Sequence, residues 1–223
     1  MGESPARFVS MQRLVEPEIL DRLPADDPEA IRSRADLRRI NGLMGNERWL
    51  VRQILQQLSA RKGVWEIGAG EGGLLRRLAA LDSGLPLTGC DLAPRPDDLP
   101  GRIVWRQGDV FDELPRQSGG VLVANLFLHH FEDPALAKLG TLLGNFDALC
   151  INEPHRSSLA LAQSSLLLPF VNRVTRHDMP VSIRAGFRRG ELPERLGLMN
   201  GRWRVREETT WRGALRMLAW RIE

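Results

Sequence analysis

The chain has 223 residues, the usual size of one globular domain, and its 43% hydrophobic and 26% charged residues suit a protein with a buried core. This balance excludes a fibrous or disordered protein. Basic residues exceed acidic residues by only three, and all of the 31 basic residues except Lys62 and Lys138 are arginines. The chain contains no run of five or more basic residues, so the sequence does not indicate a nucleic-acid-binding surface.

Cysteine content and hydropathy suggest a protein of the reducing cytoplasm. Cys90 and Cys150 are the only cysteines and form no Cys-x-x-Cys pair, so we predict no disulfide framework and no metal site. The first ten residues lack the apolar run of a signal peptide. The most apolar stretch, 159–171, is broken by polar residues and is shorter than the roughly 20 residues of a membrane span. We therefore expect a cytoplasmic protein without a membrane span.

Two helices are predicted before the first strand. Asp27 is a favourable N-cap followed by a proline, so a helix should begin there, and Gly42 and Gly45 should interrupt it. A second helix is predicted over 46–60, where apolar residues recur on one face, with Gly63 as its end.

From residue 63 onward, short strands alternate with helices. Five strands are predicted, each closed by Gly, Asp, Asn or Pro. They cover 64–67, 85–90, 103–107, 121–126 and 149–152. Helices are predicted at 72–81 and 134–143, the second capped by Asp133. This alternation indicates a doubly wound α/β fold with a mostly parallel sheet.

The last part of the chain departs from this alternation. Residues 203–207 and 214–222 have β-like patterns separated by a short turn, which predicts a terminal antiparallel hairpin and a seven-stranded sheet in all. The roughly 50 residues of 153–200 exceed one crossover helix. We expect extra helices there, forming a cap over the carboxyl ends of the strands, where ligands of such folds bind.

The most specific motif is EIGAGEGG at 66–73, where the first strand runs into a glycine loop and a helix. Such a loop allows positive φ and close approach of a ligand to backbone donors. Glycines 68, 70 and 73 also satisfy the dinucleotide fingerprint, and Asp91 lies near the expected distance for a ribose contact. Glu66 favours a different ligand, because a carboxylate at the strand end would repel a pyrophosphate and would suit an ammonium group.

This motif resembles the cofactor loop of the seven-stranded class I S-adenosylmethionine-dependent methyltransferases, in their small-molecule branch. Three later motifs follow in the family's order: TGCDL at 88–92, GDV at 108–110 and NLFLHHF at 125–131. Residues 18–48 and 176–187 more weakly resemble a bacterial branch that methylates small metabolites, some associated with polyketides.

The resemblance implies S-adenosylmethionine as cofactor and S-adenosylhomocysteine as product. Asp91 would hold the ribose hydroxyls, and Asp109 with the following amide would recognise adenine. The full set of cofactor-binding residues implied is Glu66, Gly68, Ala69, Gly70, Gly72, Asp91, Leu92, Asp109, Val110, Asn125 and Leu126. The single domain would then comprise an N-terminal helical segment (1–62), a cofactor-binding core (63–152), a cap (153–200) and a hairpin (201–223).

A base that takes a proton from the methyl acceptor would have to be a histidine, because the chain has four histidines and no tyrosine. His129 and His130 follow the fourth strand, where the transferable methyl should lie, although they could instead pack the loop. His177 with Asp178 could form an acid–base pair in the cap or a solvated turn. We take His129, His130 and His177 as the catalytic candidates.

Three charged residues are candidates for binding the acceptor. Arg156 and Arg184 could hold an anionic group, with an ion-paired surface role as the alternative in so arginine-rich a chain. Glu153 closes the fifth strand and could orient the acceptor or cap a helix.

We therefore predict a methyltransferase acting on a small molecule that is phenolic, quinone-like or polyketide-derived. No Asn/Asp-Pro-Pro-aromatic segment follows the fourth strand, and no RNA-binding module is recognisable, so no nucleic-acid partner is expected. A non-catalytic sensor or scaffold that binds S-adenosylmethionine, or a protein or RNA methyltransferase, are the alternatives. The acceptor atom, the choice of histidine and the oligomeric state, including a homodimer, stay open.

Overall fold

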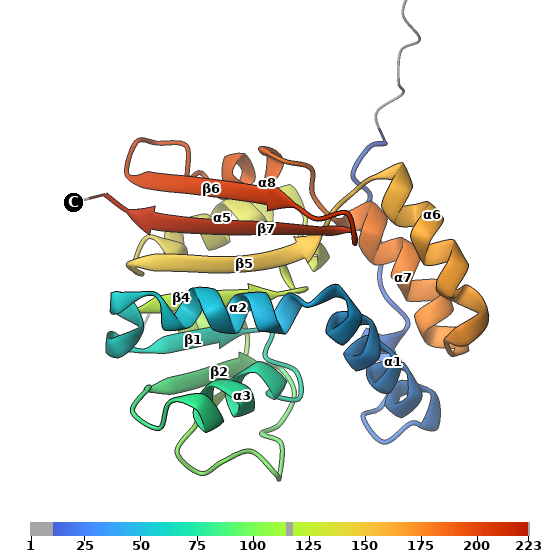
Figure 1. Ribbon diagram of the computed structural model, residues 1–223, viewed down its shortest axis with the longest axis horizontal. Helices are drawn as coiled ribbons and strands as arrows, with labels where there is room; N and C mark the ends of the chain where they lie inside the picture. Colours follow the sequence, from blue (N-terminus) through green and yellow to red (C-terminus); the bar gives the residue numbers. More distant parts are fainter. Residues whose placement is uncertain (1–10, 115–117, 223) are drawn as a thin grey trace, which may run out of the picture.

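The structure is a computed structural model that describes residues 11–114 and 118–222, apart from the side chain of Leu58 (Figure 1). The prediction about a signal peptide in residues 1–10 lies outside the described part. Seven strands form one sheet in the order β3-β2-β1-β4-β5-β7-β6. Their bounds are β1 (Val64–Ile67), β2 (Leu87–Asp91), β3 (Val104–Gln107), β4 (Val121–Asn125), β5 (Ala148–Pro154), β6 (Trp203–Thr209) and β7 (Ala214–Arg221).

Strands β1 to β5 are parallel, and β7 runs antiparallel to both β5 and β6. The predicted fold class, a mostly parallel doubly wound sheet with a terminal hairpin, is confirmed. Strand β5 is longer than the predicted 149–152, because β7 continues to pair with it as far as Pro154. The two residues added at that end, Glu153 and Pro154, bring β5 into the region of the candidate site.

Helices cover both faces of the sheet. One face carries α2 (Asn46–Leu55) and α3 (Gly73–Leu81), whose side chains join a buried cluster that includes Leu50, Ile54 and Leu75. The other face carries α4 (Val110–Glu113), α5 (Asp133–Leu143) and α8 (Glu191–Arg195). Their cluster includes Leu139, Phe146 and Leu192. Burial of these apolar side chains on both faces fixes the sheet between the helical layers.

Helix α1 (Pro28–Met44) begins as predicted, since the Asp27 carboxylate accepts hydrogen bonds from two backbone amides of its first turn. Two expectations about the N-terminal helices are wrong. Gly42 does not interrupt α1, which continues to Met44 and ends at Gly45 in the left-handed conformation. Helix α2 ends at Leu55 rather than near residue 60, and a separate 3-10 turn, η2 (Leu58–Lys62), leads into β1.

The predicted cap of α5 is also wrong. Glu132 is the N-cap residue and its side chain makes no capping hydrogen bond, while Asp133 is the first residue of the helix. The Asp133 carboxylate instead faces two arginines, Arg13 at 3.2 Å and Arg195 at 2.8 Å. The Asp133 carboxylate, which the local sequence predicted to cap α5, is thus held by arginines from distant parts of the chain.

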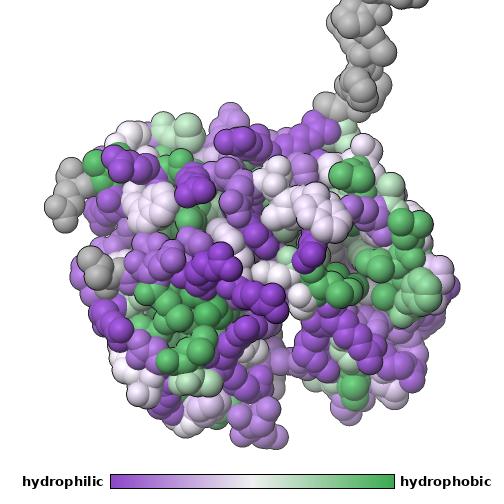
Figure 2. Space-filling model, in the orientation of Figure 1, coloured by the Kyte–Doolittle hydropathy of each residue, from purple (hydrophilic) through white to green (hydrophobic). Residues whose placement is uncertain are grey.

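A second group of helices lies at the carboxyl ends of the parallel strands (Figure 1). It comprises η1 (Leu20–Arg22), α1, α6 (Ser158–Leu167), η5 (Leu168–Phe170) and α7 (Arg173–Ala185). Helix α1 packs against α7, with a hydrogen bond of 2.9 Å between the hydroxyls of Ser33 and Thr175. In Figure 2 a notch separates this group from the part of the molecule that carries β1 to β3. No helix in the described ranges combines the length and apolar character needed to cross a bilayer.

Candidate active site at the carboxyl ends of the strands

The loop after β1 has the backbone conformation that its glycines predict. Gly68, Gly70 and Gly72 have φ values of 63°, 52° and 69°, a region that residues with a side chain rarely adopt. A Cβ atom at Gly68 would lie 2.2 Å from the ring of Phe127. The Ala69 amide donates to the carbonyl of Cys90 at 3.2 Å, which ties the loop to β2. The loop therefore presents its backbone closely to whatever lies at this edge of the sheet.

Glu66 is a buried carboxylate next to this loop. Its side chain is only 4% exposed, and its Oε2 atom has no hydrogen-bond partner among the described residues. Burial raises the pKa of Glu66 well above its ordinary value, and the charges of Glu47 and Asp91 raise it further. A buried carboxylate without a partner is costly, so the site favours a cation beside Glu66.

Asp91 ends β2 and faces the same loop. Its Oδ2 atom accepts a hydrogen bond of 2.7 Å from the Gly70 amide, and its Oδ1 atom accepts one of 2.9 Å from the Ala93 amide. These contacts orient the carboxylate at the mouth of the glycine loop. The neighbouring Leu92 is 74% exposed.

The GDV segment follows β3. The Asp109 carboxylate accepts a hydrogen bond of 2.9 Å from the Phe111 amide and so caps the short helix α4. Val110 is buried, whereas Asp109 is exposed. Asp109 therefore has a structural role of its own as the cap of α4.

The turn after β4 carries local backbone strain. Leu126 has a φ of 56° and is the one residue other than glycine with positive φ in the described ranges. Its amide donates to the carbonyl of Asn152 at 2.8 Å, and the side chain of Asn152 donates to that of Asn125 at 2.9 Å. Contacts with β5 thus hold the turn in place.

Glu153, at the end of β5, organises the segment that follows this turn. Its fully buried carboxylate accepts hydrogen bonds from the amides of Phe127 at 3.0 Å, Leu128 at 2.8 Å and His129 at 3.2 Å. It also lies 2.8 Å from Nδ1 of His129. Both oxygens of Glu153 are therefore engaged with the segment that carries the two histidines.

His129 lies between two carboxylates. Opposite Glu153, its Nε2 atom is 3.4 Å from Oε1 of Glu18, which also accepts a hydrogen bond of 2.5 Å from the Ser182 hydroxyl. Burial lowers the pKa of His129, but the hydrogen bonds and charges of Glu153 and Glu18 outweigh burial and raise the pKa to about 9. The two carboxylates thus favour the protonated ring.

His130 is more accessible than His129. Its side chain is 28% exposed, and its Nδ1 atom lies 3.4 Å from a carboxylate oxygen of Asp21, whose side chain is 55% exposed. The rings of His129 and His130 have their centres 4.2 Å apart. The segment η1 and the residues just before it thus supply one carboxylate to each histidine.

His177, on α7, contacts its neighbour in sequence. Its Nδ1 atom lies 2.8 Å from Oδ1 of Asp178, and the same carboxylate accepts hydrogen bonds from the amides of Ile19 and Leu20 at 2.8 and 2.9 Å. His177 also lines a cavity of about 340 Å³ together with Glu18 and Val181. Helix α7 and the N-terminal segment form this cavity beside the carboxylate that faces His129.

Comparisons with known proteins identify the fold. No family model matches the sequence, and no curated protein matches it. A crystal structure of the plantazolicin methyltransferase BpumL, in complex with a monoazolic desmethylPZN analog and SAH, is similar with a TM-score of 0.70. The match is 14% identical and covers 88% of this chain and 91% of that one. The chain has the fold of the S-adenosylmethionine-dependent methyltransferases.

Other solved methyltransferases share this fold. An O-methyltransferase family protein from Burkholderia thailandensis has a TM-score of 0.55 and 18% identity, with 89% of this chain and 64% of that chain covered. The small RNA methyltransferase HEN1 has a TM-score of 0.59 and 13% identity, with 81% of this chain and 25% of that chain covered. Methyltransferases with this fold therefore include enzymes that methylate quite different acceptors.

The two arginines predicted to bind the acceptor lie in different surroundings. Arg156 is 3% exposed and donates to the carbonyls of Met11 and Gly186 and to the carboxylate of Glu191, at 3.0, 2.5 and 2.5 Å. Its guanidinium is thus engaged with protein groups. Arg184 is exposed in the last turn of α7.

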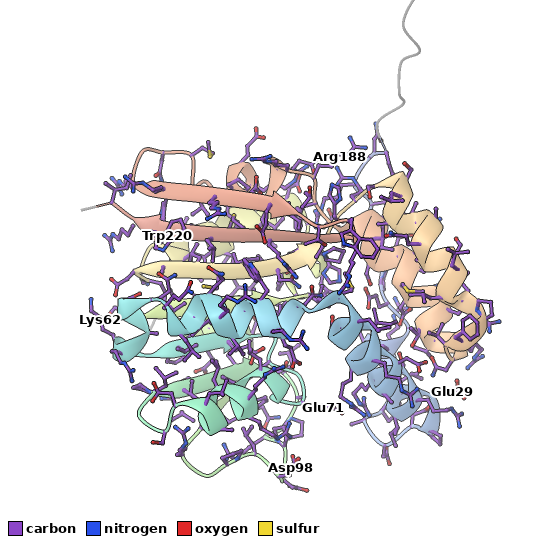
Figure 3. The ribbon with its side chains drawn as sticks, viewed as in Figure 1. Glu29, Lys62, Glu71, Asp98, Arg188 and Trp220 are labelled. Carbon is purple, nitrogen blue, oxygen red and sulfur yellow. The ribbon has the colours of Figure 1, made fainter. Side chains whose placement is uncertain are left out.

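Several residues near the candidate active site have no sequence motif to identify them. Glu18 and Asp21 contact the two histidines across more than a hundred residues of chain, and Glu47 adds its charge to the Glu66 site. Arg34 pairs with Glu71 of the glycine loop at 3.2 Å, and Arg38 pairs with it as well. Figure 3 shows Glu71 on the side of the sheet that faces α1. A charged residue in a helix gives no sign of such a distant partner.

Proposed function

We propose that this protein is an S-adenosylmethionine-dependent methyltransferase acting on a small-molecule acceptor. Glu66 carries the proposal, because a buried carboxylate without a partner beside a glycine loop suits a ligand with an ammonium group and repels one with a pyrophosphate. The shared fold supports the same cofactor, since BpumL was crystallised with SAH and the Burkholderia thailandensis protein belongs to an O-methyltransferase family.

The residues around the loop fit the parts of this cofactor. Glu66 would face the ammonium group, Asp91 the ribose hydroxyls, and Asp109 with the Val110 amide the adenine. The remaining candidates are Gly68, Ala69, Gly70, Gly72, Leu92, Asn125 and Leu126, which form the backbone surfaces at the ends of β1, β2 and β4. When bound, S-adenosylmethionine supplies an electrophilic methyl group that an acceptor atom takes by in-line displacement.

The acceptor would meet the cluster of His129, His130, Glu18 and Asp21, which we call the histidine–carboxylate cluster. Within it, His129 is held by Glu153 and is a positioning residue, because each of its ring nitrogens faces a carboxylate of the protein. The more accessible His130 would contact the acceptor. An acceptor hydroxyl would pass its proton to the His130 ring, which makes the acceptor oxygen a better nucleophile.

The cavity beside Glu18 supports a small acceptor. Its volume of about 340 Å³ lies within the range of roughly 300–1,000 Å³ that is usual for small-molecule sites. His177 lines it from α7, in agreement with a cap function for part of 153–200. A phenolic, quinone-like or polyketide-derived molecule would combine an apolar body with a hydroxyl that the histidine–carboxylate cluster can contact.

Calorimetric titration of the purified protein tests the cofactor. S-adenosylhomocysteine should bind, and NADH should not. Micromolar binding of NADH without binding of S-adenosylhomocysteine would contradict the proposal. Incubation with methyl-labelled S-adenosylmethionine and separate sets of phenols, short azole peptides and RNA then identifies the acceptor, and label found only in RNA or peptide would overturn the small-molecule assignment.

A further inference from the structure

We propose that the histidine–carboxylate cluster binds a divalent first-row transition-metal ion through His129, His130 and Glu18. This inference rests on the proposed function for its role in catalysis, but not for the binding itself. One donor atom from each of these three residues lies within 4.8 Å of the other two, a separation at which small side-chain movements can bring all three onto one ion. Two imidazoles and one carboxylate form the donor set that zinc, manganese and iron sites commonly use.

The distance between His129 and Glu18 suits a shared metal ion as well as a weak hydrogen bond. Nε2 and Oε1 are 3.4 Å apart, longer than the roughly 2.7–3.2 Å of a good hydrogen bond. Two donors that each lie about 2.1 Å from one ion, at a tetrahedral angle, are separated by about 3.4 Å. The two atoms are therefore already at the spacing that an ion would impose.

The two imidazoles also have compatible positions. Their ring centres are 4.2 Å apart. Two imidazole rings that bind one ion at about 2.1 Å have their centres about 4.5 Å apart at a right angle and about 5 Å apart at a tetrahedral angle, so the two rings would have to separate by about 1 Å or less. Both histidines belong to η4 (Leu128–His130), where His129 contacts Glu18 just before η1 and His130 contacts Asp21 within η1.

Carboxylates around the cluster provide the usual support of a metal site. A ligating histidine almost always donates its other ring N–H to a carboxylate or carbonyl, which fixes the direction of the ligating nitrogen. Nδ1 of His129 has this contact with Glu153 at 2.8 Å, and three backbone amides hold Glu153 in turn. Glu18 and Glu153 lie on either side of the His129 ring and favour a positive charge between them. A divalent ion bound to Nε2 can supply this charge in place of the Nε2 proton.

The cluster is also open on one side. His130 is partly exposed, and Glu18 lines the cavity assigned to the acceptor. An ion held by three protein ligands keeps coordination positions for a further group, as catalytic sites do. There it would lower the pKa of an acceptor hydroxyl and so assist loss of its proton. Acceptors with an oxygen beside the methylated hydroxyl, such as ortho-diphenols and hydroxyquinones, could use two of these positions.

Metal titration of the full chain tests this inference without an acceptor. After treatment with EDTA, calorimetry with zinc, manganese and cobalt should show one ion per chain for at least one metal. Bound cobalt should give the visible absorption bands of a histidine-ligated ion. Absence of binding for all three metals at millimolar concentration would overturn the proposal.

Variants locate the ion. Glu18→Gln and His130→Gln should each weaken binding by roughly tenfold or more, as loss of a ligand or its support does. His177→Gln is the matched control, since this exposed histidine lies outside the cluster and should leave binding unchanged. Affinity for S-adenosylhomocysteine, measured on every variant, reports correct folding. Metal affinity that is unchanged in both Glu18→Gln and His130→Gln would place the ion elsewhere and overturn the proposal.

The metal and methyltransferase proposals can fail separately. If S-adenosylhomocysteine binds and methyl transfer proceeds in EDTA while no ion binds, the metal inference is wrong and the proposed function stands. If an ion binds at the cluster and S-adenosylhomocysteine does not bind, the proposed function is wrong and the metal site stands.

Discussion

The Glu153 carboxylate lies 2.8 Å from Nδ1 of His129 and accepts hydrogen bonds from three consecutive amides of the segment that contains this histidine. One side chain at the end of β5 therefore fixes both the backbone after β4 and the ring that projects from it. This relationship makes Glu153 a positioning residue of the histidine–carboxylate cluster.

Glu153→Gln should destabilise the protein. The amide N–H₂ group would face backbone N–H donors, and the buried negative charge beside the proton-bearing His129 would be lost. Loss of one partner in such a buried network costs about 3 kcal/mol, which urea unfolding monitored by circular dichroism can measure. Glu132→Gln, at an exposed site, is the control. An unfolding free energy equal to that of the unsubstituted protein would show that these contacts contribute little.

Glu66→Gln should stabilise the cofactor-free protein. Burial raises the pKa of Glu66 well above its ordinary value of 4.5. As the pH rises from about 4.5 toward that higher pKa, the unfolded state loses the proton of Glu66 while the folded state keeps it. Stability of the unsubstituted protein therefore falls over that range, and glutamine removes the loss. Thermal unfolding at about pH 8 should show a melting temperature a few degrees higher for Glu66→Gln, with little difference near pH 4.

The same substitution should weaken cofactor binding. Loss of the charge that faces the ammonium group should cost roughly 2 kcal/mol, or about thirtyfold in the dissociation constant of S-adenosylhomocysteine. Glu71→Gln, on the exposed side of the loop, is the comparison. Unchanged affinity in a more stable Glu66→Gln protein would remove Glu66 from the binding site.

Asp91→Ala should weaken binding of S-adenosylhomocysteine by about 2 to 3 kcal/mol, since a charged acceptor of the ribose hydroxyls is lost. The melting temperature should change little, because Asp91 is partly exposed. Asp97→Ala, an exposed aspartate in the following loop, provides the control in the same titration. If the two variants bind equally well, the ribose lies elsewhere.

His177→Ala should slow methyl transfer at saturating cofactor, because His177 lines the cavity assigned to the acceptor. Affinity for S-adenosylhomocysteine should change less than about threefold, which is under 1 kcal/mol. Initial rates with the identified acceptor, combined with calorimetry, separate the two effects. Lost cofactor affinity with normal turnover would instead assign α7 to the cofactor site. Arg184→Ala, on the same helix, tests whether its exposed guanidinium contacts the acceptor.

Local sequence determined the elements that position the cofactor loop. The predicted 64–67 strand coincides with β1, and the glycines after it have positive φ, because strand pattern and glycine conformation depend on residues close together in the chain. The order of strands and helices likewise predicted the fold class, since right-handed crossovers leave few topologies. Helix ends were predicted less well, as Gly42 and Asp133 show, because a helix tolerates a single glycine and because long-range ion pairs engage the Asp133 carboxylate.

Tertiary structure alone decided how the site is charged. Glu18 reaches His129, and Glu47 reaches Glu66, from segments that no spacing rule connects to them. The missing hydrogen-bond partner of Glu66 depends on what packs around it, and the pKa of His129 depends on two carboxylates from separate segments of the chain. Secondary structure reflects interactions over a few residues, whereas burial and electrostatic fields reflect every segment that folding brings within a few ångströms.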